Sequence, residues 1–247
     1  MSDRRVVVLD TPDDVAYQGA DEFEVRARAA IAEHGRFTVA LSGGSTPRAM
    51  FELLASPEFA EDIDWAHVFF FWADERCVPA DDERSNYRLA VDALLSPIAM
   101  PQTNIFRMRG ELDPHAGAVD YNERLAAFFG SSIVFDLIYL GLGSDGHTAS
   151  LFPHSSALDV VDQACSAVHV PGNAAAEWRL TLTYPVLNAT RCAMFLVEGK
   201  EKADVLARVL EGPRDAANLP AQAVAPVRGT LVWLADRAAA SSLHSHA

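Results

Sequence analysis

The sequence has few cysteines and no long apolar run. Only three of its 247 residues are cysteines, Cys77, Cys165 and Cys192, and their wide separation provides neither a disulfide framework nor metal-ligand spacing. No apolar run approaches the roughly 18 residues that span a bilayer. The apolar stretch 6–9 is also too short for the hydrophobic region of a signal peptide. These absences predict a cytoplasmic protein.

Basic residues are also scarce, with 20 Lys and Arg against 34 Asp and Glu, so the formal net charge is −14. This charge repels nucleic acid and anionic membrane surfaces over a wide area, and we expect neither as a partner. A small anionic ligand remains compatible with the charge, provided that local donors overcome the overall field. Any site for such a ligand therefore has to be built from a few well-placed donors.

Several familiar catalytic motifs are missing. The sequence has no H-E-x-x-H, EF-hand or C-x-x-C pattern, and it therefore predicts no metal. It also has no G-x-S-x-G elbow, which argues against the serine mechanism of α/β-hydrolases.

The sequence does contain a regular alternation of apolar runs and segments of helical period, and half of its residues are hydrophobic. This alternation is typical of a parallel sheet covered by helices on both faces. Several runs are apolar throughout, as strands buried on both faces should be. We predict one α/β domain over residues 1–247. The predicted strands are 5–9, 37–41, 68–72, 135–140, 179–183, 191–197 and 230–234. Helices are predicted around 47–54, 121–129 and 203–210.

Ligands of open α/β sheets bind beyond the carboxyl ends of the strands, so the loops that follow strands are candidate sites. The first such loop contains Gly43, Gly44, Ser45 and Thr46 before Pro47. Thr46 is a good N-cap and proline a good first helical residue, which predicts a helix start here. Glycines allow close approach of backbone N–H groups, and the helix N-terminus attracts anions. These residues predict a phosphate cradle, although a well-capped turn would need the same residues.

A second loop follows the strongly apolar strand 68–72. It carries Asp74 and Arg76, and Ser85-Asn86 lies a few residues further on. Arg76 is able to grip a phosphate or carboxylate with two hydrogen bonds, while Asp74 is able to accept bonds from sugar hydroxyls or act as a base. The alternative is a solvated loop with an internal ion pair.

The third loop, Gly141-Leu-Gly-Ser-Asp-Gly-His147, follows a buried strand. An imidazole titrates near neutral pH, which suits His147 to general base catalysis, and Asp145 is close enough in sequence to orient it. The alternative is a structural histidine. The loop also matches G-x-G-x-x-G, the dinucleotide fingerprint. That fingerprint requires a continuing helix, whereas Pro153 limits any helix here to about one and a half turns.

Taken together and in this order, the three loops resemble those of the 6-phosphogluconolactonases. The segments 179–183, 199–203 and 233–236 fit the same family, so the resemblance covers nearly the whole chain. Glucosamine-6-phosphate deaminases share the three-loop plan, but they typically carry an aromatic residue in place of Arg76. They also carry a glutamate in place of Phe152, which here follows in Thr148-Ala-Ser-Leu-Phe-Pro153. Both differences favour the lactonase.

The resemblance implies a three-layer α/β/α fold with a mostly parallel, modified Rossmann-like sheet. It also implies hydrolysis of 6-phospho-D-glucono-1,5-lactone to 6-phosphogluconate, without a cofactor, by a monomer or small homo-oligomer. His147 would be the general base, with Asp145 orienting it and Asp74 binding substrate hydroxyls. The phosphate and the developing oxyanion would be bound by Gly43, Gly44, Ser45, Thr46, Arg76, Arg179 and Lys202. An amino-sugar-phosphate deaminase or isomerase, a non-catalytic sugar-phosphate sensor and a dinucleotide-dependent oxidoreductase remain as alternatives.

Overall fold

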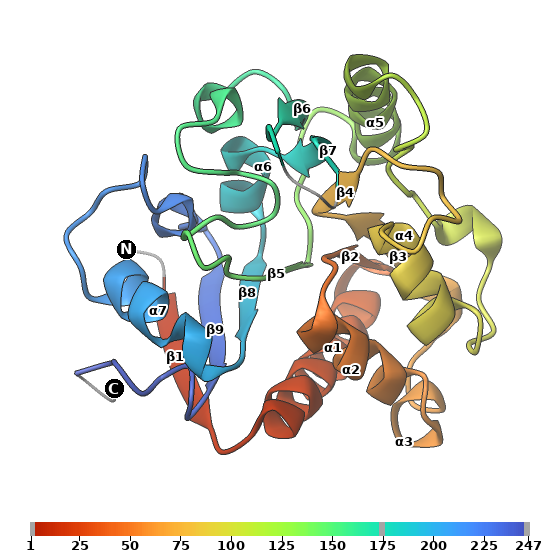
Figure 1. Cartoon of the computed structure of the whole chain (residues 1–247). Coiled ribbons are helices and arrows are strands. Elements are labelled where there is room, and N and C mark those ends of the chain that lie inside the picture. Colours follow the sequence, from red (N-terminus) through yellow and green to blue (C-terminus); the bar gives the residue numbers. More distant parts are fainter. Residues whose placement is uncertain (1–2, 173–175, 245–247) are drawn as a thin grey trace.

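Six parallel strands form the central sheet, in the order β1-β9-β8-β5-β2-β3 (Figure 1). The structure is a computed structural model that describes residues 3–172 and 176–244. The strands of the central sheet are β1 (Asp3–Leu9), β2 (Phe37–Leu41), β3 (Val68–Trp72), β5 (Leu137–Leu140), β8 (Cys192–Val197) and β9 (Thr230–Asp236). Strands β2, β5 and β8 are buried along their whole length, which explains why their sequences are uniformly apolar. All seven predicted strands are confirmed as strands, with ends that differ by at most two residues, and six of them belong to this sheet.

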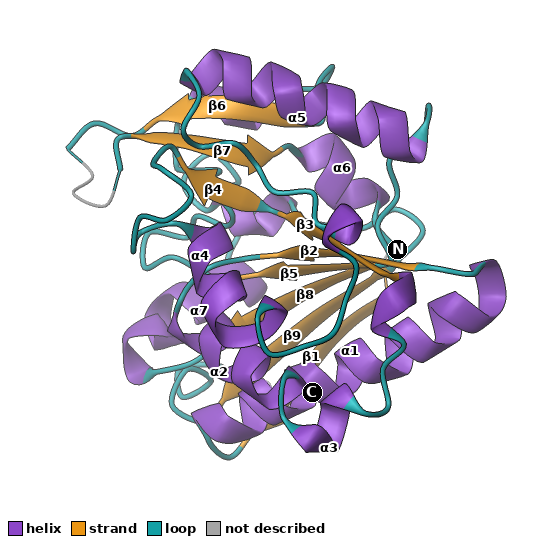
Figure 2. Cartoon of the chain, turned by 90° about the vertical axis from the view of Figure 1, so that its right-hand side faces the viewer, coloured by secondary structure: helices purple, strands orange, loops and turns teal. Residues whose placement is uncertain are grey.

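Helices cover both faces of this sheet. They are α1 (Pro12–His34), α2 (Ser45–Leu54), α3 (Pro57–Ala60), α4 (Asn86–Ala90), α5 (Pro114–Phe129), α6 (Tyr184–Ala189) and α7 (Ala203–Leu210). A π-helical turn covers Val91–Leu95, and 3-10 turns cover Trp65–His67, Gln102–Asn104, Ser156–Asp159, Lys200–Lys202 and Pro220–Ala223. Figure 2 shows α1, α2 and α3 on one side of the sheet and α5 and α6 on the other. The three-layer, mostly parallel fold class is therefore confirmed.

Helix α1 is the longest helix, yet its apolar periodicity does not predict it. Its buried face consists largely of alanine and glycine, and Gly19 is so close to α2 that an added Cβ would lie 2.8 Å from the sulfur of Met50. Small residues allow the two helices to approach closely but provide little contrast with the polar face. The helix start is well marked, because Thr11 and Asp14 form a capping box.

A second, smaller sheet lies beside the first and is antiparallel, in the order β4-β7-β6. Its strands are β4 (Asp74–Arg76), β6 (Cys165–His169) and β7 (Trp178–Leu182). The prediction that the strand at 179–183 belongs to the parallel sheet is therefore wrong. The composition of a buried strand is the same in either sheet, so it does not specify the partner. Helix α5 packs on this sheet, where the Asn122 side chain bonds both the N–H and the C=O of Cys165 at 2.8 Å.

The two sheets meet at a single buried residue, Ala73. Its N–H donates to the carbonyl of Leu41 in β2 at 2.8 Å, while its carbonyl accepts from the N–H of Leu182 in β7 at 2.7 Å. The chain thus leaves the large sheet at the end of β3 and enters the small sheet without a loop. The hydroxyl of Tyr121 on α5 accepts from the N–H of Trp72 at 3.0 Å. This bond provides a partner for a buried backbone N–H at the end of β3, just before the junction.

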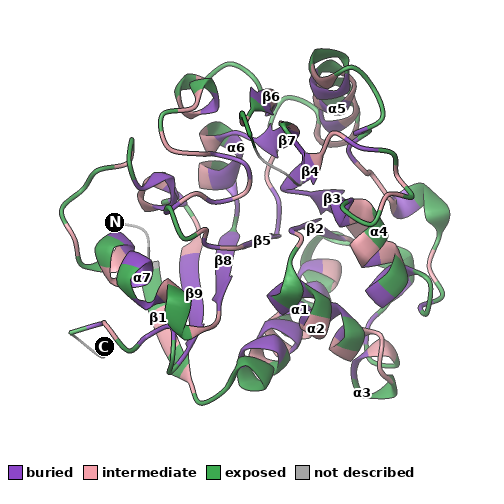
Figure 3. Ribbon diagram, in the orientation of Figure 1, coloured by how far each residue is buried: buried purple, intermediate pink, exposed green. Residues whose placement is uncertain are grey.

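Buried residues line the strands and the inner faces of the helices, while the outer helix faces are exposed (Figure 3). No helix among the described residues has the length and apolar character needed to cross a membrane.

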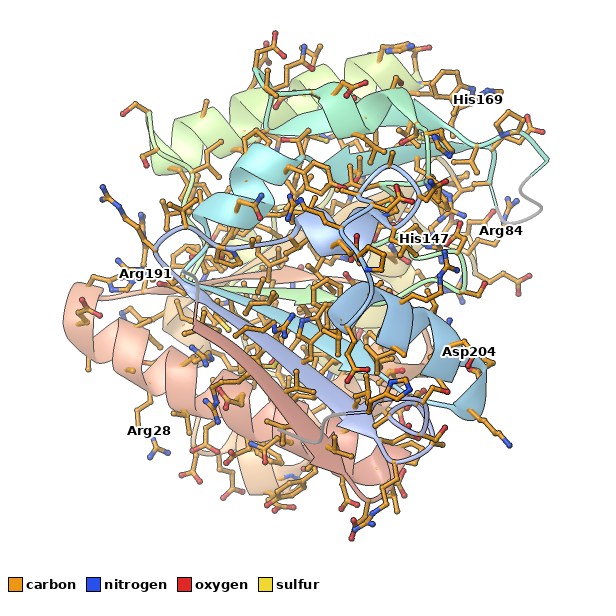
Figure 4. The ribbon with its side chains drawn as sticks, turned by 90° about the vertical axis from the view of Figure 1, so that its left-hand side faces the viewer. Arg28, Arg84, His147, His169, Arg191 and Asp204 are labelled. Carbon is orange, nitrogen blue, oxygen red and sulfur yellow. The ribbon has the colours of Figure 1, made fainter. Side chains whose placement is uncertain are left out.

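A buried carboxylate, that of Asp136, lies at the end of the central sheet opposite His147. Asp136 is 6% exposed and accepts hydrogen bonds from the N–H and hydroxyl of Thr38 at 2.8 and 2.7 Å. It also contacts His34 at 3.2 Å and Arg191 at 3.3 Å. Figure 4 shows Arg191 and His147 at opposite ends of the sheet. Asp136 therefore joins α1, β2, β5 and the start of β8.

Replacing Asp136 by asparagine should lower the free energy of unfolding by about 2–3 kcal/mol, because an amide provides no charge for its partners and directs an N–H at other donors. Urea unfolding would measure the change. The control is Asp92→Asn, which removes a carboxylate from an exposed pair with Arg88 and should cost less than about 1 kcal/mol. Equal costs for the two variants would contradict a stabilising role for Asp136.

Candidate functional site

A cavity of about 360 Å³ lies at the carboxyl ends of the central strands and is bordered by the small sheet. The cavity is lined by Ser42, Gly43, Gly44, Ser45, Thr46, Pro47, Asp74, Arg76, Asn86, Gly141, Leu142, Gly143, His147, Ala149, Arg179, Leu196, Val197, Glu198, Glu201 and Lys202. Nine of the ten predicted site residues are among them. The tenth, Asp145, does not line the cavity but contacts His147. The structure therefore brings together loops that are more than 150 residues apart in sequence.

The imidazole of His147 is held on two sides. Its Nδ1 lies 2.5 Å from Oδ1 of Asp145, which also accepts the backbone N–H of His147 at 3.1 Å. The ring of Phe152 packs against the imidazole with a centroid distance of 4.3 Å. In the view of Figure 4, His147 lies above α7. The side chain is 29% exposed, so the ring is positioned but remains accessible from the cavity.

The ionisation state of Asp145 determines which ring nitrogen of His147 carries the proton. Partial burial raises the pKa of Asp145, but the hydrogen bonds and charge of His147 outweigh this effect and leave the pKa below its ordinary value. Asp145 is therefore ionised at neutral pH and accepts a hydrogen bond from the Nδ1–H of His147. Nε2 of a neutral ring then carries the free lone pair that a base requires.

The third loop needs glycine at position 143 because of this imidazole. A Cβ added to Gly143 would lie 2.0 Å from Nδ1 of His147 and 2.7 Å from Oδ1 of Asp145. Gly143 also donates its N–H to the carbonyl of His147 at 2.8 Å. The next element after β5 in the described chain is the short 3-10 turn Ser156–Asp159, so the loop lacks the continuing helix of a dinucleotide fingerprint. Its glycines instead make room for the imidazole and the carboxylate.

The register of the small sheet places two arginines side by side. Arg76 of β4 is directly opposite Arg179 of β7, and Asp74 is opposite Thr181. Opposite residues in an antiparallel pair project from the same face, and like charges there destabilise the pair. Burial and the charge of Arg76 lower the pKa of Arg179, while Asp74 opposes this effect. Nε of Arg76 is buried without a hydrogen-bond partner among the described residues. The pair is suited to an anion that both guanidinium groups are able to bind.

Asp74 lies beside these arginines and is only 6% exposed. Its carboxylate accepts from Ser150 Oγ at 2.7 Å and from Asn86 Nδ2 at 3.2 Å. Asn86 is itself 1% exposed, and its Oδ1 has no partner among the described residues. A Cβ added to Gly43 would lie 1.9 Å from that oxygen, so Gly43 is needed for Asn86 to fit. Asn86 is therefore a further candidate site residue. The Ser85-Asn86 pair is noted in the sequence after the second loop, but no role is assigned to it there.

Glu75, between Asp74 and Arg76, points to the other face of β4 and anchors the segment that carries Asn86. Its carboxylate accepts from the N–H groups of Arg76, Asn86 and Tyr87 and from the hydroxyl of Ser85, at 2.7–2.9 Å. Burial raises the pKa of Glu75 to about 7, although these four donors favour the ionised form.

The first loop enters the cavity as the N-terminus of α2. The predicted start of this helix is wrong by two residues, since α2 begins at Ser45 with Gly44 as its N-cap and Thr46 within the first turn. Gly44 has φ +121°, a conformation that side chains rarely adopt. Because the cap has no side chain, the first N–H groups of α2 receive no side-chain hydrogen bond from it.

The fourth segment follows β8 and carries Lys202 in a 3-10 turn ahead of α7. Glu198 and Glu201 lie in the same segment and also line the cavity. Neither carboxylate is assigned a role from the sequence: Glu198 belongs to no recognised motif, and in the segment 199–203 only Lys202 is assigned one. Among the described residues, no group of three or more His, Cys, Asp or Glu is arranged to hold a metal ion.

A family model described as "Glucosamine-6-phosphate isomerases/6-phosphogluconolactonase" matches residues 10–233, and the chain belongs to this family. The 6-phosphogluconolactonase of Synechocystis sp. is 41% identical over 223 residues, which cover 88% of this chain and 89% of that protein. The resemblance found in the sequence is therefore confirmed.

Solved structures show the same architecture. A 6-phosphogluconolactonase from Trypanosoma cruzi has a TM-score of 0.86 at 27% identity and covers 99% of both chains. A monomeric glucosamine-6-phosphate deaminase has a TM-score of 0.82 at 20% identity, with coverage of 96% of this chain and 99% of the deaminase. At that identity the deaminase shows a shared fold only.

Replacing Gly143 by alanine should break the contact between His147 and Asp145, since the new methyl group would lie only 2.0 Å from Nδ1. In proton NMR spectra, the far-downfield signal expected for a proton shared by Nδ1 and the carboxylate should disappear. The matched variant Gly141→Ala should keep this signal, because a Cβ there meets nothing within 4 Å. Persistence of the signal in Gly143→Ala would show that the loop relaxes around the methyl group.

Proposed function

We propose that this protein hydrolyses 6-phospho-D-glucono-1,5-lactone to 6-phosphogluconate, with His147 as the general base. The observation that carries the proposal is that His147, held by Asp145, faces a cavity that the Arg76–Arg179 pair also lines. The relatives named 6-phosphogluconolactonase support the same substrate. The cytoplasm is the proposed location. No nucleic-acid or membrane partner is proposed, because the net charge of −14 would repel both.

Nε2 of His147 takes a proton from a water molecule as that water attacks the carbonyl carbon of the lactone. The Asp145 carboxylate stabilises the resulting imidazolium and keeps the ring in position. The carbonyl oxygen becomes an oxyanion, and the bond to the ring oxygen then breaks. His147 returns its proton to that leaving oxygen, so the base is regenerated. The new carboxylic acid then loses its remaining proton to solvent, and the product carries a carboxylate. A lactone is already a reactive ester, which is why no cofactor is required.

The remaining cavity residues bind charge and orient the sugar. Arg76 and Arg179 on the small sheet, Lys202 and the N-terminus of α2 together bind the phosphate and the oxyanion. Asp74 is held by Ser150 and Asn86 and accepts hydrogen bonds from sugar hydroxyls. Such preorganised donors stabilise developing charge without reorganising during the reaction.

The packing of Phe152 favours the lactonase over a deaminase. In the deaminases this position carries a glutamate that helps to orient the imidazole, whereas here an apolar ring packs 4.3 Å from the imidazole centroid. The histidine therefore has one carboxylate partner, Asp145. A non-catalytic sensor would need the cations but not an imidazole positioned on two sides.

One pair of assays tests the proposed activity directly. We expect the purified protein to release acid from the phosphorylated lactone well above its spontaneous hydrolysis, and to release no ammonia from glucosamine-6-phosphate. Release of ammonia without acid would identify a deaminase instead.

Replacing His147 by asparagine should reduce kcat by about 10²–10⁴-fold, the usual contribution of a positioned base, while 6-phosphogluconate still binds. Steady-state kinetics and calorimetry measure these effects.

His67→Asn provides the control, because His67 lies in an exposed turn outside the cavity and pairs with Asp64. It should leave kcat unchanged. Near-normal turnover in His147→Asn would overturn the assignment of the base.

A further inference from the structure

A carboxylate occupies the part of the cavity where an anion would be expected to bind. Glu198 follows directly after β8, and its Oε1 accepts a hydrogen bond from the hydroxyl of Ser45 at 3.2 Å. Ser45 is the first residue of α2. Both residues line the cavity. The carboxylate thus meets the helix N-terminus that the proposed function assigns to phosphate.

The backbone around Glu198 keeps the side chain near this position. On one side is Val197, which is 2% exposed and ends β8. On the other side is Gly199, whose N–H donates to both oxygens of the buried Asp236 carboxylate at 3.2 Å. Glu198 therefore starts from a fixed point between a buried strand and an anchored turn, and only its side chain is able to move away from α2.

Glu198 does not serve as one half of a structural ion pair. Across residues 3–172 and 176–244, no basic nitrogen lies within 4 Å of its carboxylate, and Ser45 is its side-chain hydrogen-bond partner. Helix α2 has no acidic residue in its own first turn and no side-chain cap. Glu198 therefore provides the negative charge that helix N-termini attract.

Two other buried polar groups at the cavity have no protein partner within the described residues. Nε of Arg76 is a buried donor without a partner, and Oδ1 of Asn86 is a buried acceptor without one, within the part of the chain that the structure describes. Glu198 does not satisfy either group. It occupies only the α2 end of the cavity, which leaves the rest available for a sugar phosphate.

The carboxylates also alter the charge balance that a ligand meets. Three cations line the cavity, namely Arg76, Arg179 and Lys202, and three carboxylates line it as well, namely Asp74, Glu198 and Glu201. A phosphate dianion approaching α2 is repelled by Glu198 at close range, where a charge in a partly buried site has a large effect.

We propose that Glu198 is an internal competitor for phosphate, whose carboxylate must leave Ser45 before the phosphate of a ligand binds at α2. This inference rests on the proposed function and adds to it a residue that determines affinity. Because substrate and product carry the same phosphate, the competition weakens both equally. Such uniform effects change KM and product affinity without contributing to the chemical step.

The test uses the full-length protein with Glu198→Gln, since glutamine keeps an oxygen that is able to accept from Ser45 but carries no charge. We expect KM for the phosphorylated lactone and Kd for 6-phosphogluconate to fall by the same factor, about three- to tenfold. Hydrolysis of D-glucono-1,5-lactone, which has no phosphate, should show no such tightening. Tighter product binding slows product release, so kcat should not rise.

Glu52→Gln is the matched control, because it removes one negative charge from the exposed side of α2, where Glu52 pairs with Arg48, outside the cavity. It should leave KM and Kd unchanged. Equal tightening in both variants would show that only net charge matters, and would overturn the proposal. Unchanged or weaker binding in Glu198→Gln would also overturn it, as would a collapse of kcat in the folded variant.

Calorimetry separates this inference from the proposed activity. If the wild-type protein does not hydrolyse the lactone, the affinities for 6-phosphogluconate and for inorganic phosphate still decide the role of Glu198. Tighter binding by Glu198→Gln would then support the competitor while the proposed activity fails. If the wild-type protein hydrolyses the lactone but Glu198→Gln does not bind 6-phosphogluconate more tightly, the proposed activity stands and the competitor role of Glu198 is overturned.

Discussion

The hydrogen bonds of Ala73 determine how the site is assembled. This one buried residue bonds to β2 of the parallel sheet through its N–H and to β7 of the antiparallel sheet through its carbonyl. Strand β4 therefore begins directly where β3 ends, and its side chains project over the carboxyl edge of the large sheet. A flexible loop at this point would leave Asp74 and Arg76 free to turn toward solvent. The junction instead places them opposite the loops of β2, β5 and β8.

Because of this junction, a protein of net charge −14 is able to concentrate positive charge in one place. The cations come from two neighbouring strands of the small sheet and from the turn after β8, segments that are distant in the sequence. The repulsion between Arg76 and Arg179 is a cost of the fold in the absence of a ligand. An anion that both guanidinium groups bind would reverse that cost. Under the proposed function, the pairing therefore serves binding rather than stability.

Predictions from the sequence succeed where local residues determine the outcome. Buried parallel strands must be apolar, so six of them are recognisable, and the third loop reveals both His147 and Asp145. Three features depend on distant contacts and were not predictable. Strand β4, with the sequence Asp-Glu-Arg, has no strand-like composition and forms only because β7 pairs with it. The assignment of β7 to a second sheet has the same origin. The contact of Glu198 with Ser45 is the third, because the two residues are 153 positions apart in the sequence.

Hydrolysis changes the electrostatics of the bound molecule, since the neutral lactone becomes a carboxylate while the phosphate remains. A cavity that bound the substrate with every available cation would bind the more highly charged product more tightly still. Carboxylates that line the cavity lower its affinity for both molecules, and one at the phosphate end does so without disturbing the groups around the reacting carbon. Glu198 meets that condition, because Ser45 lies at the start of α2 whereas His147 and Asp145 belong to the loop after β5. In the proposed mechanism, affinity and chemistry are controlled from different strands of the same sheet, which would allow one to change without altering the geometry of the other.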